Sequence, residues 1–332
     1  MNSEEIKSLF QSFSNIKVGV IGDVMLDTYW WGKVDRISPE APVPVVAVSK
    51  REQRIGGAGN VALNLQSLGA QVHILSVLGA DTEGAEVASL MSGQQIHTNY
   101  LLNSDHRITT NKIRIISKNQ HMLRLDAEIT HPLNSQDEQL LIEQFSKYLQ
   151  KEKPHIVILE DYNKGVLTAG VIEAIIALCK QQHVFTAVDP KRKHFFAYKG
   201  VDIFKPNLHE AKEGLNMVGD EVNIEVLNTI HKALFTQLQH ATSLITLSEK
   251  GVYYQTQNAA ELIPTHIRTI ADVSGAGDSV IAVAAIVFAA TQNVKLMAEI
   301  ANIAGGLVCE EVGTVAINKE RLLQECQAIL AK

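Results

Sequence analysis

Short apolar segments alternate with stretches of helical periodicity along most of the chain. Hydrophobic positions recur with helical spacing over 58–68, 82–92, 134–150, 168–182 and 220–240. Five intervening segments are rich in β-branched residues and run into Gly, Asp, Ser or Pro: 17–23, 72–81, 155–162, 184–190 and 243–251. This alternation predicts an α/β fold with a parallel sheet covered on both faces. Ligands of such sheets bind beyond the carboxyl ends of the strands, so the polar residues there are the first candidates for chemistry.

Two regions interrupt the alternation, 43–49 and 96–126, with short strand-like segments and few helical signals. The second region predicts a β-hairpin in which 111–117 and 121–126 are joined by a turn at 118–120. Inserted strands of this kind form a sheet edge, a lid or an oligomer face.

The C-terminal part of the chain predicts another hairpin within 251–270 and then only helices. We expect these helices over 277–290, 294–310 and 318–330, and the first is apolar almost all round, which is typical of a deeply buried helix. The whole pattern predicts one α/β domain, 1–332, with a small β lid from about 24–54 and 96–126.

The composition is that of a globular protein with a large core. Of 332 residues, 46% are apolar and 20% are charged, which excludes a disordered chain, a collagen-like fibre and a coiled coil. The net charge of −6, without any dense Lys/Arg run, argues against a nucleic-acid partner. Three cysteines without a CxxC pair do not form a disulfide framework. The polar N-terminus is not a secretory signal, and no apolar run approaches the ~20 residues of a membrane span. We expect a cytoplasmic protein with no membrane partner.

The sharpest candidate for chemistry is the segment ADVSGAGDSV at 271–280. Gly275, Ala276 and Gly277 allow a tight turn before the apolar helix, whose N-terminal N–H groups can bind an anion. Asp278 at the start of that helix is either an N-cap or a general base beside a bound phosphoryl group. The second alternative suits phosphoryl transfer, where positioning and charge neutralisation dominate catalysis.

An earlier glycine cluster, Gly56, Gly57 and Gly59, precedes a predicted helix with Asn60 in its first turn. The cluster is either a tight strand–helix junction or a place where the backbone approaches a polyhydroxy ligand closely. It is not a GxGxxG dinucleotide motif, and the chain has neither a Walker A motif nor a protein-kinase HRD or DFG set. If the protein binds ATP, its fold is neither that of the P-loop proteins nor that of the protein kinases.

Two further groups of polar residues follow strands. Asp23 and Asp27 stand beside Trp30 and Trp31 in 22–32, where carboxylates can accept hydrogen bonds from hydroxyls and a ring can cover a sugar or pack a lid.

The other group is Asn207 and Glu210, three apart at a predicted helix start. They form either a helix cap with a first-turn acid or a pair of oxygen ligands that holds Mg²⁺ through water.

In this order, GGAGN at 56–60, NLHE at 207–210 and DVSGAGD at 272–278 resemble the PfkB/ribokinase family of small-molecule kinases. The resemblance covers about 17–316, and the late motif is the specific one. It implies a ribokinase-like three-layer fold with a mostly parallel central sheet and a small β lid.

A narrower resemblance is to the D-glycero-β-D-manno-heptose-7-phosphate kinase subfamily. It rests on 22–46, 112–126, 160–165 and 189–192, with RISPEAPVPVV at 36–46 as the most distinctive piece. It implies ATP-dependent phosphorylation at the C1 hydroxyl, which gives heptose 1,7-bisphosphate for ADP-heptose and lipopolysaccharide core synthesis. Such kinases are often fused to an adenylyltransferase domain; no HxGH-type loop follows here, so a separate adenylyltransferase is expected as a pathway partner.

The resemblance also implies roles for the matching residues. Asp278 is expected to be the general base, with Gly275, Ala276 and Gly277 as the hole for the transferred phosphoryl group. ATP, Mg²⁺ and K⁺ are the implied cofactors, and a homodimer paired through lid strands is the implied assembly. Asp272 is expected at the monovalent-cation site. The implied sugar contacts are Asp23, Asp27, Gly57 and Asn60; the implied nucleotide contacts are Asn207, Glu210 (to Mg²⁺ through water), Ser248, Gly251 and Asn302.

The 7-phosphate requires cations. Candidates are Arg107, Lys112, Arg114 and Arg124 near the 111–126 hairpin, and Lys164, with Lys112, Arg114 and Lys164 preferred. Because Lys and Arg on edge strands also discourage aggregation, we expect only about two of these residues to bind phosphate.

Some positions depart from the family pattern and leave the nucleotide contacts open. Ser248 replaces a usual Gly, Lys205 replaces a usual Thr, and EDYNKG replaces a more typical Ser-Asp-Tyr. Two alternative functions are a PfkB-type kinase for fructose 6-phosphate or a nucleoside, and a non-catalytic sugar-phosphate sensor. The intact Gly275–Asp278 set argues against the sensor.

Overall fold

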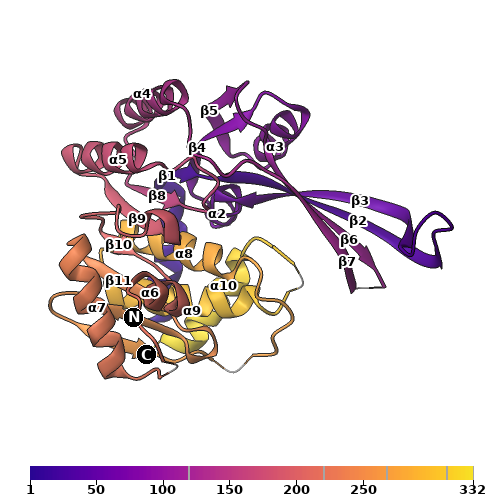
Figure 1. Cartoon of the computed structure of the whole chain (residues 1–332). Helices are drawn as coiled ribbons and strands as arrows, with labels where there is room; N and C mark the ends of the chain where they lie inside the picture. The colour runs from indigo at the N-terminus through magenta and orange to yellow at the C-terminus, as the bar shows by residue number, and fades with distance from the viewer. Residues whose placement is uncertain (119, 220, 267, 312, 332) are drawn as a thin grey trace.

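The computed structural model describes residues 1–332 apart from 119, 220, 267, 312 and 332. Its centre is a nine-stranded sheet in the order β13-β12-β11-β10-β9-β8-β1-β4-β5 (Figure 1). The strands from β11 to β5 in this order are parallel, and β12 and β13 close one edge as an antiparallel hairpin. This confirms the mostly parallel sheet that the sequence predicts. The bounds are β1 Lys17–Gly22, β4 Gln71–Gly79, β5 His97–Ser104, β8 Ile156–Glu160, β9 Phe185–Asp189, β10 Ile203–Phe204, β11 Thr242–Thr246, β12 Val252–Gln255 and β13 Ala260–Ile263.

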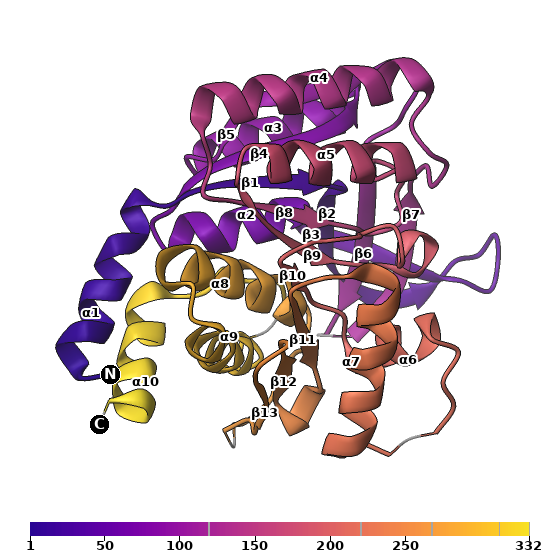
Figure 2. The same cartoon turned by 90° about the vertical axis from the view of Figure 1, so that its left-hand side faces the viewer.

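Helices cover both faces of this sheet (Figures 1 and 2). Successive strand residues alternate between two cores: Ile156 and Ile158 of β8 belong to one, Val157 and Leu159 to the other. Helices packed in the first core are α1 Ser3–Ser12, α2 Ala58–Ser67, α3 Thr82–Gly93, α8 Ala276–Thr291, α9 Val294–Val308 and α10 Lys319–Leu330. Helices packed in the second core are α4 Ser135–Glu152, α5 Ala169–Gln181, α6 Leu208–Gly214 and α7 Ile224–Leu238. Burial on both faces explains why the strands are continuous apolar runs.

Helix α8 is deeply buried, as the apolar pattern of 277–290 predicts. Every residue from 278 to 287 is buried, because α8 lies between the sheet and α9. The N-terminal helix α1 packs against the C-terminal helix α10, so the two ends of the chain lie close together (Figure 2). No helix in the described part of the chain combines the length and apolarity of a bilayer-spanning segment.

A second, four-stranded sheet projects from the body of the molecule (Figure 1). Its order is β3-β2-β6-β7, with β2 Val24–Ile37, β3 Pro44–Gly57, β6 Thr110–Ser117 and β7 Gln120–Ala127. The pairs β2–β3 and β6–β7 are antiparallel, and β2–β6 is parallel. We call these four strands the projecting sheet. β2 and β3 are buried where they leave the body and exposed toward their far ends.

Three sequence predictions need correction or fall outside the description. Residues 97–104 are not lid strands, since β5 pairs with β4 in the central sheet and Tyr100 packs in its core. The hairpin expected over 251–270 is short, with strands only at β12 and β13. The turn predicted at 118–120 includes residue 119, which lies outside the described residues.

Candidate active site

The glycine-rich turn before α8 borders a cavity of about 670 Å³. Gly275 occupies the N-cap position with φ of 78°, in the left-handed region that favours glycine, and a Cβ there would lie 3.0 Å from Thr314 Cγ2. A Cβ on Gly277 would face the Asp189 carboxylate and the Lys205 ammonium. Small residues therefore keep the first turn of α8 open to the cavity. A helix N-terminus with unpaired N–H groups and the positive end of the helix dipole binds anions.

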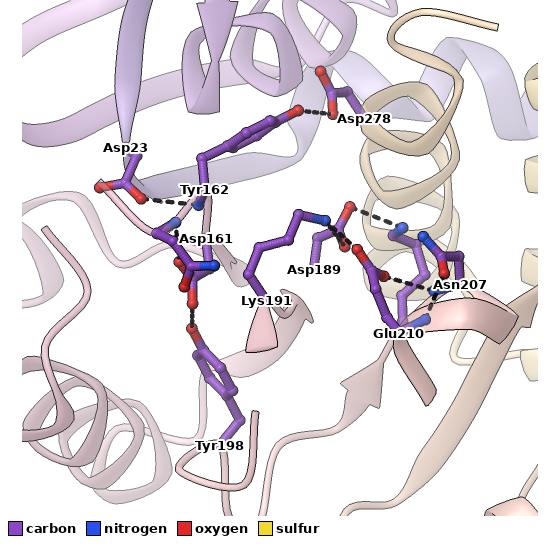
Figure 3. Close-up of polar contacts among 11 residues, drawn as sticks. Asp23, Asp161, Tyr162, Asp189, Lys191, Tyr198, Asn207, Glu210 and Asp278 are labelled. Atoms are coloured by element: carbon purple, nitrogen blue, oxygen red, sulfur yellow. Dashed lines mark hydrogen bonds and ion pairs between the residues drawn. The ribbon is translucent and has the colours of Figure 1, made fainter. Parts of the chain in front are cut away.

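Asp278 lies in this first turn and is only 5% exposed. Its Oδ2 accepts a hydrogen bond from Asn60 Nδ2 at 2.6 Å. Its Oδ1 accepts one from the Tyr162 hydroxyl at 2.7 Å (Figure 3). Burial raises the pKa of Asp278 to about 6, although both hydrogen bonds favour the ionised form. The N-cap alternative is wrong, because Gly275 is the N-cap. A carboxyl group with a pKa close to neutrality is suited to general base catalysis.

Helix α2 places Asn60 beside Asp278. The chain enters α2 through Gly57, whose φ of 61° and close approach to the Asp23 carbonyl leave no room for a side chain. One turn later, Asn64 Oδ1 accepts a hydrogen bond from the Ser279 hydroxyl at 3.0 Å. Two side-chain bonds, Asn60–Asp278 and Asn64–Ser279, therefore fix α2 against the start of α8.

Two other carboxylates lie beside Asp278. One oxygen from each of Glu160, Asp189 and Asp278 falls within 4.8 Å of the others, and all three side chains are buried. Lys205 Nζ contacts Asp189 Oδ2 at 2.8 Å, so an ammonium group already occupies part of this cluster. The spacing resembles that of a metal site, and the Lys205 ammonium supplies the positive charge opposite one of the three carboxyl groups, that of Asp189.

The loop after β8 is held by Asp23. Its Oδ2 accepts a hydrogen bond from the Tyr162 N–H at 2.8 Å (Figure 3). The same oxygen accepts one from the Lys164 N–H at 2.9 Å, and Oδ1 accepts one from the Val166 N–H at 3.0 Å. Burial and the neighbouring Asp161 raise the pKa of Asp23. The observed contacts position the loop that carries Tyr162, while the sugar contact of Asp23 stays a prediction.

The residues expected at the nucleotide line the same cavity as Asp278. They are Asn207, Glu210, Ser248, Gly251 and Asn302. Asn207 and Glu210 form a reciprocal capping box at the start of α6. Glu210 Oε1 also accepts a hydrogen bond from Lys191 Nζ at 2.5 Å (Figure 3). The cap interpretation is therefore confirmed. Their predicted contact with Mg²⁺ is not excluded by the cap, because the same side chains face the cavity.

Asp272 holds the loop before α8. One carboxylate oxygen accepts hydrogen bonds from the N–H and hydroxyl of Ser274, and the other accepts one from the Gly313 N–H at 2.9 Å. Burial alone would raise the pKa of Asp272, but these hydrogen bonds outweigh it and lower the pKa. Its role at a monovalent cation stays a prediction.

Two lysine side chains, Lys112 of the projecting sheet and Lys164 of the loop after β8, lie near each other. Lys112 of β6 lies in register with Asp27 of β2, and its Nζ is 6.0 Å from the centre of the Tyr162 ring. Burial and the nearby Lys164 lower the pKa of Lys112. Lys164 pairs with Glu128 at 2.7 Å, whereas Lys112 has no ion pair among the described residues. A bound anion would relieve the repulsion between these two ammonium groups.

The other predicted cations are already engaged by the protein. Arg114 donates to Asp27 Oδ1 at 2.5 Å, and this carboxylate outweighs burial and raises the pKa of Arg114. Buried Arg107 donates to the carbonyls of His131 and Lys164, and exposed Arg124 pairs with Asp126.

Sequence reasoning gave no role to four residues that line or support this site: Tyr162, Asp189, Lys191 and Glu160. Each stands at or just after the carboxyl end of β8 or β9, the position where ligands of parallel sheets bind. That general rule was the available signal. No local motif marks these residues, because their proximity to Asp278 depends on the packing of α8 over the two strands.

Comparison with known proteins identifies the family. Residues 15–321 match the model of the pfkB family of carbohydrate kinases. The chain belongs to this family and is a carbohydrate kinase.

The relatives agree with this assignment. The chain is 35% identical over 325 residues to the bifunctional protein HldE of Syntrophotalea carbinolica, which covers 97% of this chain. It is 38% identical over 307 residues to the protein of the same name from Helicobacter pylori, which covers 92%. In each case it spans 65% of the relative's length. Among solved structures, phosphofructokinase-2 from Escherichia coli in complex with potassium superposes with a TM-score of 0.79 at 15% identity, over 96% of this chain and all of the other. This last likeness confirms the ribokinase-like fold.

Kinase activity implies ATP and a divalent metal, and the site's residues fit both. The cavity joins the N-terminus of α8 to the ammonium groups of Lys191 and Lys205 and to the carboxylate of Glu210. Such groups match triphosphate oxygens and, through water, a hard cation. The metal, when bound, would neutralise phosphate charge.

Proposed function

We propose that this kinase phosphorylates D-glycero-β-D-manno-heptose 7-phosphate at its C1 hydroxyl, using ATP and Mg²⁺. The product would be heptose 1,7-bisphosphate, an intermediate toward ADP-heptose and the lipopolysaccharide core, with loss of the 7-phosphate and adenylylation as later steps by other enzymes. The similarity to bifunctional HldE proteins over more than nine-tenths of the chain supports the heptose phosphate as substrate.

The observation that carries the proposal is the placement of Asp278. Its carboxylate is buried in the first turn of α8 and fixed by Asn60 and Tyr162, and it lines the cavity that the nucleotide residues also line. In the proposed reaction, Asp278 takes the proton of the sugar hydroxyl while the hydroxyl oxygen forms a bond to the γ-phosphorus. The bond between that phosphorus and the β,γ-bridging oxygen breaks, and ADP leaves. The first turn of α8 holds the transferred group throughout.

The sugar phosphate would lie between Asp278 and the projecting sheet. Asn60 of α2 and Asp27 of β2 would flank the sugar, and the 7-phosphate would bind Lys112 and Lys164. Arg114, bound to Asp27, would orient that carboxylate toward the sugar. Charge-assisted hydrogen bonds to phosphate are among the stronger polar contacts in proteins.

Two further parts of the proposal concern cations and assembly. Asp272 would help to hold K⁺ near the anion site, in keeping with the potassium complex of the E. coli phosphofructokinase-2. The projecting sheet would pair with that of a second copy, since Leu123 and Leu125 of β7 are 52% and 44% exposed. Exposed apolar side chains on a sheet edge favour association.

The test is phosphoryl transfer to two acceptors under identical conditions. We expect heptose 7-phosphate to be used with a higher kcat/KM than fructose 6-phosphate. Equal or better use of the hexose phosphate would reject the heptose assignment and favour the alternative kinase. Tight binding of either sugar without any transfer would favour the sensor.

A further inference from the structure

Glu160 is a fully buried carboxyl group without a hydrogen-bond partner. It ends β8, none of its surface is exposed, and neither oxygen has a partner among the described residues. A buried charge in that position would be very unfavourable, since nothing replaces its lost hydration. This carboxyl group lies next to Asp278 and is not among the residues that line the cavity.

Strand register explains where the Glu160 side chain lies. Across β1, β8 and β9, Gly22, Glu160 and Asp189 are direct neighbours. Glu160 shares the strand face of Ile156 and Ile158, which is the face that α8 covers. Gly22 has no side chain, and the neighbouring carboxyl groups of Glu160 are those of Asp189 on the next strand and of Asp278 on α8. The three carboxyl groups approach within 4.8 Å.

The charges around Glu160 do not balance three carboxylates. Lys205 is 2.8 Å from Asp189 Oδ2, and Lys191, 3.6 Å from Asp189 Oδ1, makes its shorter contact with Glu210. Two tyrosines that Glu160 also influences, Tyr162 and Tyr198, donate their hydroxyl hydrogens to Asp278 and Asp161 and supply no positive charge. One carboxyl group of the cluster must therefore hold a proton.

We propose that Glu160 is a positioning residue that stays a neutral carboxylic acid in the working enzyme and donates its O–H to Asp189 Oδ1. Asp278 is then the one carboxyl group of the three that exchanges a proton during turnover. Burial, and the charges of Asp189 and Asp278, raise the pKa of Glu160 well above its ordinary value. Asp189 Oδ1 otherwise lacks a hydrogen-bond donor among the described residues.

The consequence for catalysis rests on the proposed role of Asp278. A neutral Glu160 adds no negative charge close to the place where the phosphoryl group arrives. When alkaline solution ionises Glu160, a second unpaired carboxylate repels both the phosphoryl group and the ionised base. The ionisation of Glu160 should therefore lower kcat at high pH.

The direct test does not depend on activity. In infrared difference spectra at neutral pH, wild type minus Glu160→Gln should show the C=O stretching band of a protonated carboxylic acid, shifted in heavy water. Glu173→Gln, at an exposed position of α5, is the matched control and should show only the bands of an ionised carboxylate. Absence of the protonated band in the Glu160 difference spectrum would overturn the proposal. If the variant does not fold, a pH titration of the wild-type band, which should disappear only in alkaline solution, gives the same answer.

Kinetics supply the second readout. Glutamine keeps the shape and a donor but cannot ionise, so the ratio of kcat at alkaline pH to kcat at neutral pH should be higher in Glu160→Gln than in wild type. A loss of kcat by ~10²-fold or more at every pH, with an unchanged melting temperature, would mean that Glu160 works as an ionised group and would overturn the proposal. So would Mn²⁺ binding to the nucleotide-free wild type that Glu160→Gln abolishes. If the kinase assignment itself fails, the infrared result still stands or falls on its own.

Discussion

The carboxyl edge of the central sheet and the projecting sheet handle charge in different ways. At the central sheet, Asp189, Lys205 and Asp278 are each no more than 5% exposed and are held by two packed cores. On the projecting sheet, all eight residues of β7 are exposed, and Arg124 and Asp126 pair in solvent. Electrostatic effects are strong in the first region and weak in the second. The proposed chemistry lies in the buried region, and the proposed sugar recognition and subunit pairing lie toward the exposed one.

The largest expected effect is at the buried region. Asp278→Asn should lower kcat by the ~10²–10⁴-fold typical of a lost general base, while sugar-phosphate binding by calorimetry survives. In wild type, kcat should fall as pH drops through about 6, because protonation removes the base. Asp105→Asn, at an exposed position, is the control. Full turnover of Asp278→Asn would show that this carboxylate is not the base.

Asp278→Asn should lower kcat but raise the stability of the folded protein. The pKa of Asp278 is raised, so the folded state binds a proton more readily than the unfolded chain, and the ionised carboxylate costs stability above that pKa. Asp278→Asn should therefore raise the free energy of unfolding at neutral pH by up to roughly 3 kcal/mol, which a higher melting temperature would show. The gain should vanish as pH falls from about 6 toward the ordinary aspartate value. A variant less stable than wild type at neutral pH would contradict this.

The next effect concerns the boundary between the regions. Lys112→Ala and Lys164→Ala should each raise the KM for the sugar phosphate ~10–100-fold through lost charge-assisted hydrogen bonds, with little change in the KM for ATP. Arg124→Ala is the matched control, because its guanidinium already pairs with Asp126. Initial rates with each substrate varied separately make the comparison. An equal rise in the KM for the sugar phosphate in Arg124→Ala would contradict the assignment and indicate a phosphate site farther out on the projecting sheet.

A smaller effect should separate two tyrosines of the buried region. Tyr162→Phe removes the hydroxyl that stabilises ionised Asp278, so the acid limb of the kcat profile should move to higher pH by about one unit. Tyr198→Phe removes a similar bond to Asp161 and should leave that limb in place. Identical pH profiles for the two variants would show that Tyr162 does not tune Asp278.

The smallest energetic change is expected at the exposed end. Leu123→Asp or Leu125→Asp should convert a dimer to a monomer in light scattering, because each places a charge in the proposed interface. Leu262→Asp on β13, which is 38% exposed, is the control. A wild-type protein that is monomeric at micromolar concentration would reject the paired assembly.

The sequence made the central sheet predictable but not all of its membership. Strand 156–160 is buried along its whole length and is apolar up to its last residue, Glu160, so its pattern is unambiguous. The segment 97–104 carries mixed polarity, since as an edge strand it is only partly buried, and its pattern therefore predicts a lid strand rather than a strand of the central sheet. The two-residue β10 is too short to give a periodic signal.

The candidate site divides in the same way. Gly275, Asp278, Asn60 and Glu210 were predictable because glycine turns and helix starts leave local marks in a sequence. The sequence predicts no role for Glu160 beyond its place in a motif of the family. Its lack of hydrogen-bond donors depends on the packing of β1, which carries Gly22, and of α8 against β8. Long-range packing of this kind has no short sequence signature.

The most direct measurement of the central claim is a crystal structure of Asp278→Asn with ATP, Mg²⁺ and heptose 7-phosphate, in which slow turnover preserves the ternary complex. The account predicts the C1 hydroxyl within ~2.6–3.2 Å of the residue 278 side chain, and the γ-phosphate against the first turn of α8. A sugar bound with another hydroxyl at that side chain, or with its C1 hydroxyl turned away from the γ-phosphate, would contradict it.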